Sequence, residues 1–199
     1  MNEIKIIKSP DTQRENRVPP GQRVVKGLPV LHEGPVPAFD LATWSFRLWG
    51  AVEKERRLSW AEFSGLPRVK VYADVHCVTG WSSLDHCWEG VSSAELKSLV
   101  KLRPEAKCAM VHAHTNYTVN LTLEDFFAED VVFAFTCDEE VIPPQHGFPV
   151  RLVVPRLYLW KGAKWVTGVE FLTEERPGFW ESRGYHLHGD PWKEERYRR

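Results

Sequence analysis

A cysteine at the end of an alternating segment is the residue of this chain with the clearest chemical potential. Apolar side chains recur at every second position, at Val69, Val71, Ala73, Val75 and Cys77. Period-2 alternation predicts a half-buried strand, with the polar residues between them on its other face. Residues 78–81, Val-Thr-Gly-Trp, then turn the chain into a Gly/Trp loop. Because a thiolate suits a soft metal centre, Cys77 is the first candidate ligand.

The other cysteines, Cys87, Cys108 and Cys137, form no C-x-x-C pair, so thioredoxin-like, zinc-ribbon and c-type haem motifs are absent. His76-Cys77 and His86-Cys87 can be drawn as a zinc site. Adjacent residues of a strand point to opposite faces, however, so the first pair cannot both reach one ion without a sharp break. We therefore expect Cys87, Cys108 and Cys137 to be structural. The sequence also contains no G-x-G-x-x-G signature of a flavin or nicotinamide site.

Two histidines share one face of another expected strand with Met110. His112 and His114 have the spacing of a copper or zinc pair. The competing interpretation, an exposed or hydrogen-bonded strand face, is the one that we favour. The two residues directly precede Thr115, which places them near a possible active centre.

A third group combines glycines with basic residues. His146-Gly147-Phe148-Pro149 precedes a strand that carries Arg151, and Lys161-Gly162-Ala163-Lys164 precedes another strand. Glycine lets the backbone approach a ligand closely, and backbone N–H groups with Arg and Lys can bind a phosphate without a Walker motif. The alternative is that Arg151 and Lys164 are solvated charges on strands.

The elements that must position these residues are mainly strands. Alternation predicts strands over 44–50, 69–77, 109–115, 131–135, 150–154 and 165–172. Capping patterns predict short helices that open at Ser59, Ser92 and Thr122, the second with Leu96, Leu99 and Val100 on its apolar face. Residues 27–37 are an ordered loop, because they are rich in Pro and Gly. We expect an α+β fold with mixed sheets, an N-terminal surface arm over residues 1–18 and one domain over 19–199.

Bulk properties exclude some classes of partner. The 199 residues suit one domain with a real core, and the net charge of -1 gives no reason to expect nucleic acid or an anionic membrane. No apolar run reaches the ~20 residues of a membrane span. The first residues contain no apolar core of a secretory signal, so we expect a cytoplasmic protein.

Several separated motifs, in order, resemble the sulfite-oxidase-like molybdopterin oxidoreductases. VPPGQR at 18–23 and LPVLHEGPVP at 28–37 look like the N-terminal cofactor loop of that family, and DVHCVTGW at 74–81 with WEGV at 88–91 looks like its cysteine segment. PPQHGFPVRLVVPRLYLWKGAKWVTGVEF at 143–171 looks like the pterin-phosphate segment, and GFW with GYHLHGDPW at 178–192 looks like the closing stretch. The resemblance covers residues 19–192, nearly the whole chain.

The resemblance implies a sulfite-oxidase fold and a molybdenum-molybdopterin cofactor, with Cys77 as the one protein ligand of the metal. It also implies cofactor contacts, which are carried over by motif to His32, Glu33, Thr115, His146, Arg151, Gly162, Ala163 and Lys164. The implied activity is two-electron oxygen-atom transfer, with electrons exchanged through a separate partner because no second redox centre is encoded.

One departure from the family pattern concerns the substrate. Sulfite oxidases carry an arginine soon after the ligand cysteine, whereas residues 78–84 contain no basic residue. The chain is closer to the small bacterial branch, which includes periplasmic methionine-sulfoxide-reducing proteins. We therefore expect a small S-oxide or N-oxide substrate rather than sulfite. The alternative is a non-catalytic pterin- or anion-binding protein on the same scaffold, against which an intact Cys77 argues.

Overall fold

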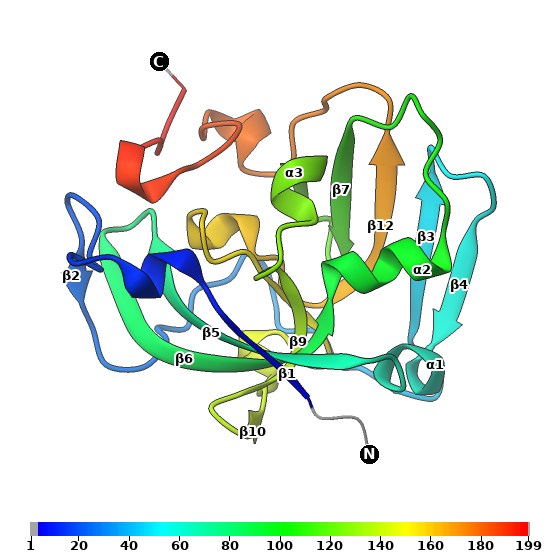
Figure 1. The fold of residues 1–199 in the computed structure, drawn as a ribbon, viewed down its shortest axis with the longest axis horizontal. Helices are drawn as coiled ribbons and strands as arrows, with labels where there is room; N and C mark the ends of the chain where they lie inside the picture. The colour runs from blue at the N-terminus through cyan, green and yellow to red at the C-terminus, as the bar shows by residue number, and fades with distance from the viewer. Residues whose placement is uncertain (1–3, 199) are drawn as a thin grey trace.

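Two mixed β-sheets form the body of the protein in the computed structural model, which describes residues 4–198 (Figure 1). The larger sheet has the order β1-β5-β6-β9-β10, and β11 also pairs with β9 and β2 with β6. Its strands are β1 Lys5–Lys8, β2 Arg23–Val24, β5 Arg68–Cys77, β6 Trp81–Ser92, β9 Val132–Cys137, β10 Glu140–Val141 and β11 Arg151–Val153. The smaller sheet has the order β4-β3-β12-β7-β8. Its strands are β3 Ser45–Gly50, β4 Arg56–Ser59, β7 Cys108–Ala113, β8 Thr118–Thr122 and β12 Val166–Leu172.

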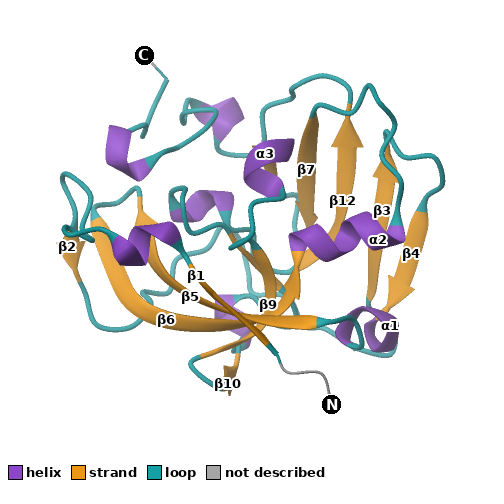
Figure 2. Cartoon of the chain, viewed as in Figure 1, coloured by secondary structure: helices purple, strands orange, loops and turns teal. Residues whose placement is uncertain are grey.

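The helices are short and connect strands (Figure 2). The expected capping box is present, because the Ser59 side chain accepts from the backbone of Glu62 and the Glu62 side chain accepts from the backbone of Ser59. Thr122 likewise accepts a hydrogen bond from the backbone of Asp125. The helices are α1 Trp60–Ser64, α2 Leu96–Leu99 and α3 Leu123–Phe126, and the 3-10 turns are η1 Pro10–Gln13, η2 Ser93–Glu95, η3 Pro144–His146, η4 Leu159–Lys161, η5 Glu181–Arg183 and η6 Pro191–Lys193. The α+β prediction is confirmed.

Two apolar clusters fill the interior. The larger one contains residues of both sheets, and in it the rings of Phe46 and Phe63 stack at 4.3 Å while Phe133 meets Phe46 edge-on at 5.3 Å. The smaller cluster includes Trp88 and the alternating apolar side chains of β5, up to Cys77. The predicted face of β5 is therefore confirmed, and it places Cys77 at the end of a buried apolar row.

The opposite face of β5 differs from the expectation of a half-buried strand. Asp74 and His76 are fully buried, because other parts of the chain cover them. Arg17 Nη2 donates to Asp74 Oδ1 at 2.6 Å, and the ring of Trp192 lies 6.0 Å from that of His76. Only the first half of β5 alternates between buried and exposed positions.

Residues 5–8, within the expected N-terminal arm, form a mostly exposed edge strand of the larger sheet. β1 pairs in parallel with β5, in the register Lys5 to Val69. Beyond it, the buried Ser9 donates its hydroxyl to Asp130 at 2.7 Å. The polar composition of this segment hid its role, because an edge strand buries only part of its surface.

Three boundaries also differ from the sequence predictions. Residues 78–80 form the expected turn, but Trp81 already begins the long strand β6 and pairs with Cys77 directly across the turn. Val100 lies beyond α2 in extended conformation, although its N–H still bonds to the carbonyl of Leu96. β7 ends at Ala113, so Thr115 lies in the following turn and not within the strand.

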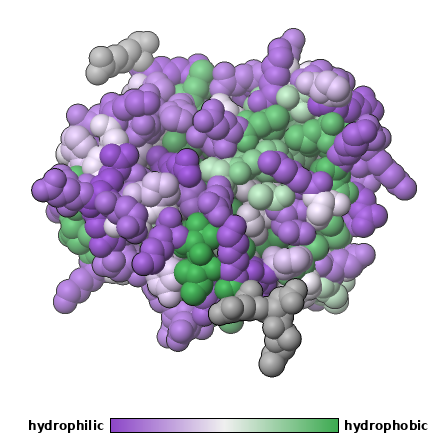
Figure 3. Space-filling model, in the orientation of Figure 1, coloured by the Kyte–Doolittle hydropathy of each residue, from purple (hydrophilic) through white to green (hydrophobic). Residues whose placement is uncertain are grey.

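The surface is mostly hydrophilic on the face of Figure 3, where apolar areas are interrupted by polar residues. No helix among residues 4–198 is both long enough and apolar enough to span a bilayer.

Candidate active site

A cavity of about 390 Å³ lies beside Cys77. This volume is within the range of small-molecule sites. Five segments that are distant in the sequence contribute to its wall: the loop over residues 28–33, the turn after β5, the residues after β7, β11 with the residues after η4, and the C-terminal segment. The lining residues include Leu28, His32, Glu33, Cys77, Thr79, Trp81, Thr115, Tyr117, Arg151, Trp160, Gly162, Lys164, Trp165, Trp180 and Tyr185.

Cys77 occupies the end of β5, where the tight turn to β6 fixes its position. The turn closes through a hydrogen bond from Gly80 N to Cys77 O at 3.0 Å, and the φ of +91° at Gly80 is favourable only for glycine. Thr79 Oγ1 donates to Cys77 Sγ at 3.2 Å, and Gln22 Nε2 donates to the Cys77 carbonyl at 3.0 Å. The sulfur thus faces the cavity from a rigid backbone and already accepts a hydrogen bond, as a metal thiolate ligand does.

Two cations on the wall have no anionic partner. Arg151 is 2 % exposed. Among the described residues, the only hydrogen bond of its guanidinium group runs from Nη1 to the carbonyl of His146 at 3.2 Å. Lys164 Nζ donates to the carbonyls of Leu31 and Gln145, both at 2.7 Å. Within residues 4–198, neither cation forms an ion pair with a carboxylate, unlike the buried Lys161. A buried charge without a counter-charge is costly, so this pair of residues suits a bound anion.

The pKa values of the basic residues around the cavity reflect the same lack of a counter-charge. Burial lowers the pKa of Arg151 to about 10, and burial together with the charge of Arg151 lowers that of Lys164 to about 7. Burial and the neighbouring Arg151 also lower the pKa of His146 to about 4, so its imidazole is neutral at pH 7. An anion bound at this wall reverses these shifts for the two cations.

Buried polar atoms without partners test whether the site suits a cofactor rich in hydrogen-bonding groups. Arg151 Nε, Thr115 Oγ1 and His146 Nδ1 are buried and make no hydrogen bond to any described residue. Such groups normally find partners, so two of them on the cavity wall, at Arg151 and Thr115, and a third in His146 directly behind Arg151 indicate a polar ligand. A phosphate beside the two cations and a pterin beside the hydroxyl and imidazole satisfy all three. The residues therefore fit molybdopterin.

Most of the residues expected to contact the cofactor line the same cavity. His32 packs its ring 5.7 Å from that of Trp165, and Glu33, Thr115 and Gly162 lie on the wall. His146 lies behind Arg151 and is connected to the wall through its backbone carbonyl. Ala163 differs, because its side chain belongs to the larger apolar cluster, where its carbonyl accepts from Leu152 N at 2.8 Å. The expected contact between Ala163 and the cofactor stays a prediction, and it concerns only the backbone of this residue.

A glycine allows the two basic segments to meet. Gly147 has a φ of +121°, and a Cβ at this position would lie 3.0 Å from Arg151 Cβ and 3.2 Å from Lys164 Cβ. Any side chain here would push the loop away from both cations. The glycine of the H-G-F-P motif thus brings His146 against Arg151, which the sequence alone did not show.

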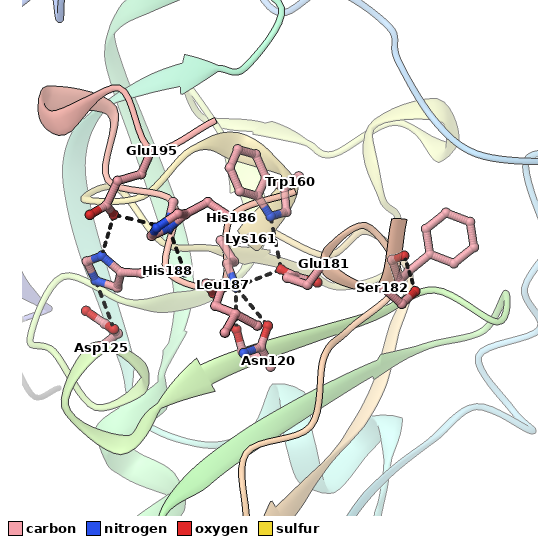
Figure 4. A network of polar contacts seen from close by, with 12 residues as sticks. Asn120, Asp125, Trp160, Lys161, Glu181, Ser182, His186, Leu187, His188 and Glu195 are labelled. Carbon is pink, nitrogen blue, oxygen red and sulfur yellow. Dashed lines mark hydrogen bonds and ion pairs between the residues drawn. The ribbon is translucent and has the colours of Figure 1, made fainter. Parts of the chain in front are cut away.

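The C-terminal segment forms one side of the cavity and is held by a buried ion pair (Figure 4). Lys161 Nζ lies 2.7 Å from Glu181 Oε1 and also donates to the carbonyl and side-chain oxygens of Asn120, both at 2.9 Å. It donates further to the carbonyl of Leu187 at 2.5 Å. Trp160 Nε1 shares the same carboxylate at 3.0 Å. This network fixes η4 against the segment that closes the site.

A second network ties the same segment to α3. His188 bridges Asp125, at 3.3 Å, and Glu195, at 2.9 Å (Figure 4). Hydrogen bonds to Asp125 and Glu195 raise the pKa of His188 to about 9, so the bridge is charged at neutral pH. The closing stretch is therefore anchored at two points.

Sequence reasoning identified Trp81 but not the other aromatic residues of the cavity. Trp81, Tyr117, Trp160, Trp180 and Tyr185 line it. Burial raises the pKa of Tyr117 and of Tyr185, so both phenols stay protonated. The GFW and GYHLHGDPW motifs were a signal for two of these residues, but nothing in their pattern placed them opposite Cys77.

His112 is hydrogen-bonded on the sheet face, as the favoured interpretation predicted, whereas His114 lies just beyond the end of β7. His112 Nε2 lies 3.1 Å from Glu170 Oε2, and the ring of His114 meets that of Phe39 at 5.0 Å. Neither residue belongs to a metal-binding group within the described part of the chain. His112 is therefore a hydrogen-bonded residue of the sheet face.

Comparison with known proteins supports this interpretation of the cavity. The family described as "Oxidoreductase molybdopterin binding domain" matches residues 33–180. The chain is 42 % identical over 191 residues to the uncharacterized oxidoreductase YuiH of Bacillus subtilis, with 96 % of each chain covered. It is 25 % identical to the sulfite oxidase of Arabidopsis thaliana, over 78 % of this chain and 49 % of that protein.

More distant similarities agree in fold and family. The chain is 27 % identical to the protein-methionine-sulfoxide reductase catalytic subunit MsrP of Campylobacter jejuni, over 72 % of this chain and 54 % of the relative. It spans about half of the length of both the plant and the Campylobacter relatives. The crystal structure of the sulfane dehydrogenase SoxCD from Paracoccus pantotrophus matches with a TM-score of 0.66 at 20 % identity, over 72 % of this chain and 41 % of that one. The chain therefore belongs to the oxidoreductase molybdopterin binding domain family, has the sulfite-oxidase fold, and is an oxidoreductase that uses a molybdenum-molybdopterin cofactor.

Proposed function

We propose that the protein catalyses two-electron oxygen-atom transfer on a small, neutral S-oxide or N-oxide, with Cys77 as the protein ligand of molybdenum. The observation that carries the proposal is that Cys77 lines one cavity together with aromatic side chains and with two cations that form no ion pair with a carboxylate among residues 4–198. When bound, the cofactor supplies the oxygen-atom transfer and the two electrons; the chain supplies the ligand, the anion site and the pocket.

On the cation wall, Arg151 and Lys164 bind the phosphate of the cofactor. A charge-assisted contact to phosphate is strong because both partners are ionised, and the buried Arg151 gains most from losing its unpaired state. His146 and Thr115 orient the pterin through the atoms that have no partner in the protein. The same groups exclude bulk water, since each faces the ligand and not solvent.

On the aromatic wall, the chain favours an uncharged substrate. Residues 78–84 contain no cation, and Arg196 donates to the carbonyl of Val78 instead of lining the cavity. The two cations that do line the cavity are occupied by the cofactor in this proposal. Tyr185, which remains protonated, is a donor for the oxygen of a sulfoxide or N-oxide, and Trp81 and Trp180 suit its apolar part.

Electrons arrive through a separate partner in this proposal. Supporting it, the Campylobacter relative is named a catalytic subunit and an Azospira oryzae relative, 26 % identical, is named a reductase subunit, YedZ1. The expected cytoplasmic location stays a prediction.

The test uses protein produced in cells that make the cofactor, with its molybdenum content measured. Reduction of sulfoxides and N-oxides with an artificial donor and oxidation of sulfite with an artificial acceptor are assayed on the same sample. We expect turnover of a neutral oxide and little turnover of sulfite, and Cys77→Ser serves as the inactive control. Sulfite turnover clearly above that of every oxide would contradict the proposed substrate class. Molybdenum-loaded protein without any turnover would favour a binding protein.

A further inference from the structure

Three potential metal ligands meet outside the cofactor cavity, where β6 and β9 lie side by side. His86 belongs to β6, Cys137 ends β9, and Asp138 begins the turn to β10. Trp88 of β6 pairs with Cys137, so His86 and Cys137 share the inner face of the sheet. Among the described residues, this is the one group of three or more His, Cys, Asp or Glu side chains whose ligand atoms lie close enough for one ion.

The distances within the group resemble those of a tetrahedral zinc site. Bond lengths of about 2.0 Å to N or O and about 2.3 Å to S imply separations of about 3.3 Å between N and O and about 3.5 Å for pairs with S. Cys137 Sγ lies 3.7 Å from His86 Nδ1 and 3.5 Å from Asp138 Oδ2. His86 Nδ1 lies 2.8 Å from Asp138 Oδ2. Only this last pair must open, by about half an ångström.

The hydrogen bonds around His86 leave its Nδ1 free as a ligand. Ser83 Oγ is placed to donate its single proton to the carbonyl of Gly27 at 2.8 Å. It must then accept from His86, whose Nε2 lies 2.7 Å away, so the ring proton of a neutral His86 is on Nε2. Metal-bound histidines characteristically donate their other ring N–H in this way.

Asp138 is oriented equally well. Its Oδ1 accepts from the backbone N–H of Cys87 at 2.8 Å, which leaves Oδ2 directed at His86 and Cys137. A neutral His86 with its proton on Nε2 would thus present a lone pair to a carboxylate oxygen. A cation between them, a second proton on His86 or the thiol proton of Cys137 relieves this conflict, and a donor set of one imidazole, one thiol and one carboxylate suits a borderline metal cation.

We propose that His86, Cys137 and Asp138 form a binding site for Zn²⁺ or a similar borderline divalent cation, separate from the molybdenum site. The Asp138 side chain is 52 % exposed, so the ion has a path from solvent and a fourth position for water. Both residues of the turn, Asp138 with φ of +53° and Glu139 with φ of +69°, have left-handed conformations. The ion would join β6 to the β9–β10 turn.

The test titrates full-length, tag-free protein with Co²⁺ after treatment with a chelator, and follows the sulfur-to-cobalt charge-transfer absorption. We expect about one Co²⁺ per chain with this band, displaced by Zn²⁺. Cys137→Ser should abolish the band. The exposed and conservative Asp138→Asn should weaken binding at least about tenfold, as losses around metal ligands do.

Two cysteine variants locate the ion. Cys87→Ser removes the thiol next to His86 in sequence, and Cys77→Ser removes the thiol of the cofactor cavity; the band should persist in both. Circular dichroism of every variant separates loss of binding from loss of fold. Wild-type protein that binds no Co²⁺ would overturn the proposal and leave a protonated His86 paired with Asp138. A band that survives Cys137→Ser, or that disappears in Cys77→Ser, would also overturn it.

Discussion

Two lysines three positions apart in the sequence have opposite surroundings. Lys161 is fully buried, and its ammonium meets the carboxylate of Glu181 at 2.7 Å together with the side chain of Asn120. Lys164 lies on the cavity wall beside Arg151 and meets only backbone carbonyls within residues 4–198. Lys161 therefore has its counter-charge within the fold, whereas Lys164 has none there.

This contrast separates a structural charge from a ligand-binding one. Burial lowers the pKa of both lysines, but Glu181 opposes the shift at Lys161, while Arg151 adds to it at Lys164. A protein that leaves two neighbouring cations without an anion becomes less stable until a ligand supplies one. In the function proposed above, the phosphate of molybdopterin is that ligand.

The largest expected effect is on stability. Removing one partner of a buried ion pair leaves the other charge unpaired, so Lys161→Met should lower the free energy of unfolding by about 3–5 kcal/mol. Lys164→Met, in contrast, removes an unpaired charge and should leave the cofactor-free protein about as stable as before. Denaturant unfolding of cofactor-free protein measures both variants. Equal losses in the two would show that the lysines do not differ.

The next effect is on cofactor retention. Arg151→Met removes a charge-assisted phosphate contact of about 1.5–3 kcal/mol, which corresponds to about tenfold or more in affinity. Arg68→Met is the matched control. Like Arg151, which lies 5.6 Å from the ring of Trp88, Arg68 lies over an aromatic ring, that of Phe135 at 5.2 Å. Unlike Arg151, it is partly exposed and pairs with Glu89. Pterin content after purification and dialysis measures retention. Full retention in Arg151→Met would count against the phosphate assignment.

A smaller effect concerns the pH dependence of cofactor binding. In the free protein, the pKa of Lys164 is lowered to about 7, and a bound phosphate raises it. Below pH 7 the lysine is charged in both states, so Lys164 should contribute no pH dependence to the affinity. Above pH 7 binding requires uptake of a proton, and affinity should fall by up to about tenfold per pH unit. Lys164→Met should bind the cofactor more weakly than the wild type at pH 6, and its affinity should change less with pH. If its affinity falls as steeply above pH 7 as that of the wild type, Lys164 is not the origin of the pH dependence.

Local patterns in the sequence predicted those features of the fold that depend on residues close together in the chain. The alternation of β5 placed Cys77 on the apolar face, and the serine and threonine caps located the starts of α1 and α3. Cofactor contacts were carried over from the motifs, and most of those residues line one cavity.

What the sequence did not predict depends on contacts between distant segments. Asp74 and His76 look exposed by pattern but are covered by the N-terminal segment and by Trp192. The partner of Lys161 is far along the chain, so nothing in K-G-A-K distinguishes its first lysine from its last. Tyr185, Trp180 and Trp160 likewise reach the cavity of Cys77 only through tertiary packing.

The most direct test of this account compares two cysteines of neighbouring strands. Cys77 lines the cavity, whereas Cys87 does not. Molybdenum content and the molybdenum(V) resonance signal are measured for Cys77→Ser and Cys87→Ser, purified from cells that make the cofactor. We predict that Cys77→Ser loses or strongly alters the signal and that Cys87→Ser retains that of the wild type. A signal abolished by Cys87→Ser and unchanged by Cys77→Ser would contradict the assignment of Cys77 as the metal ligand.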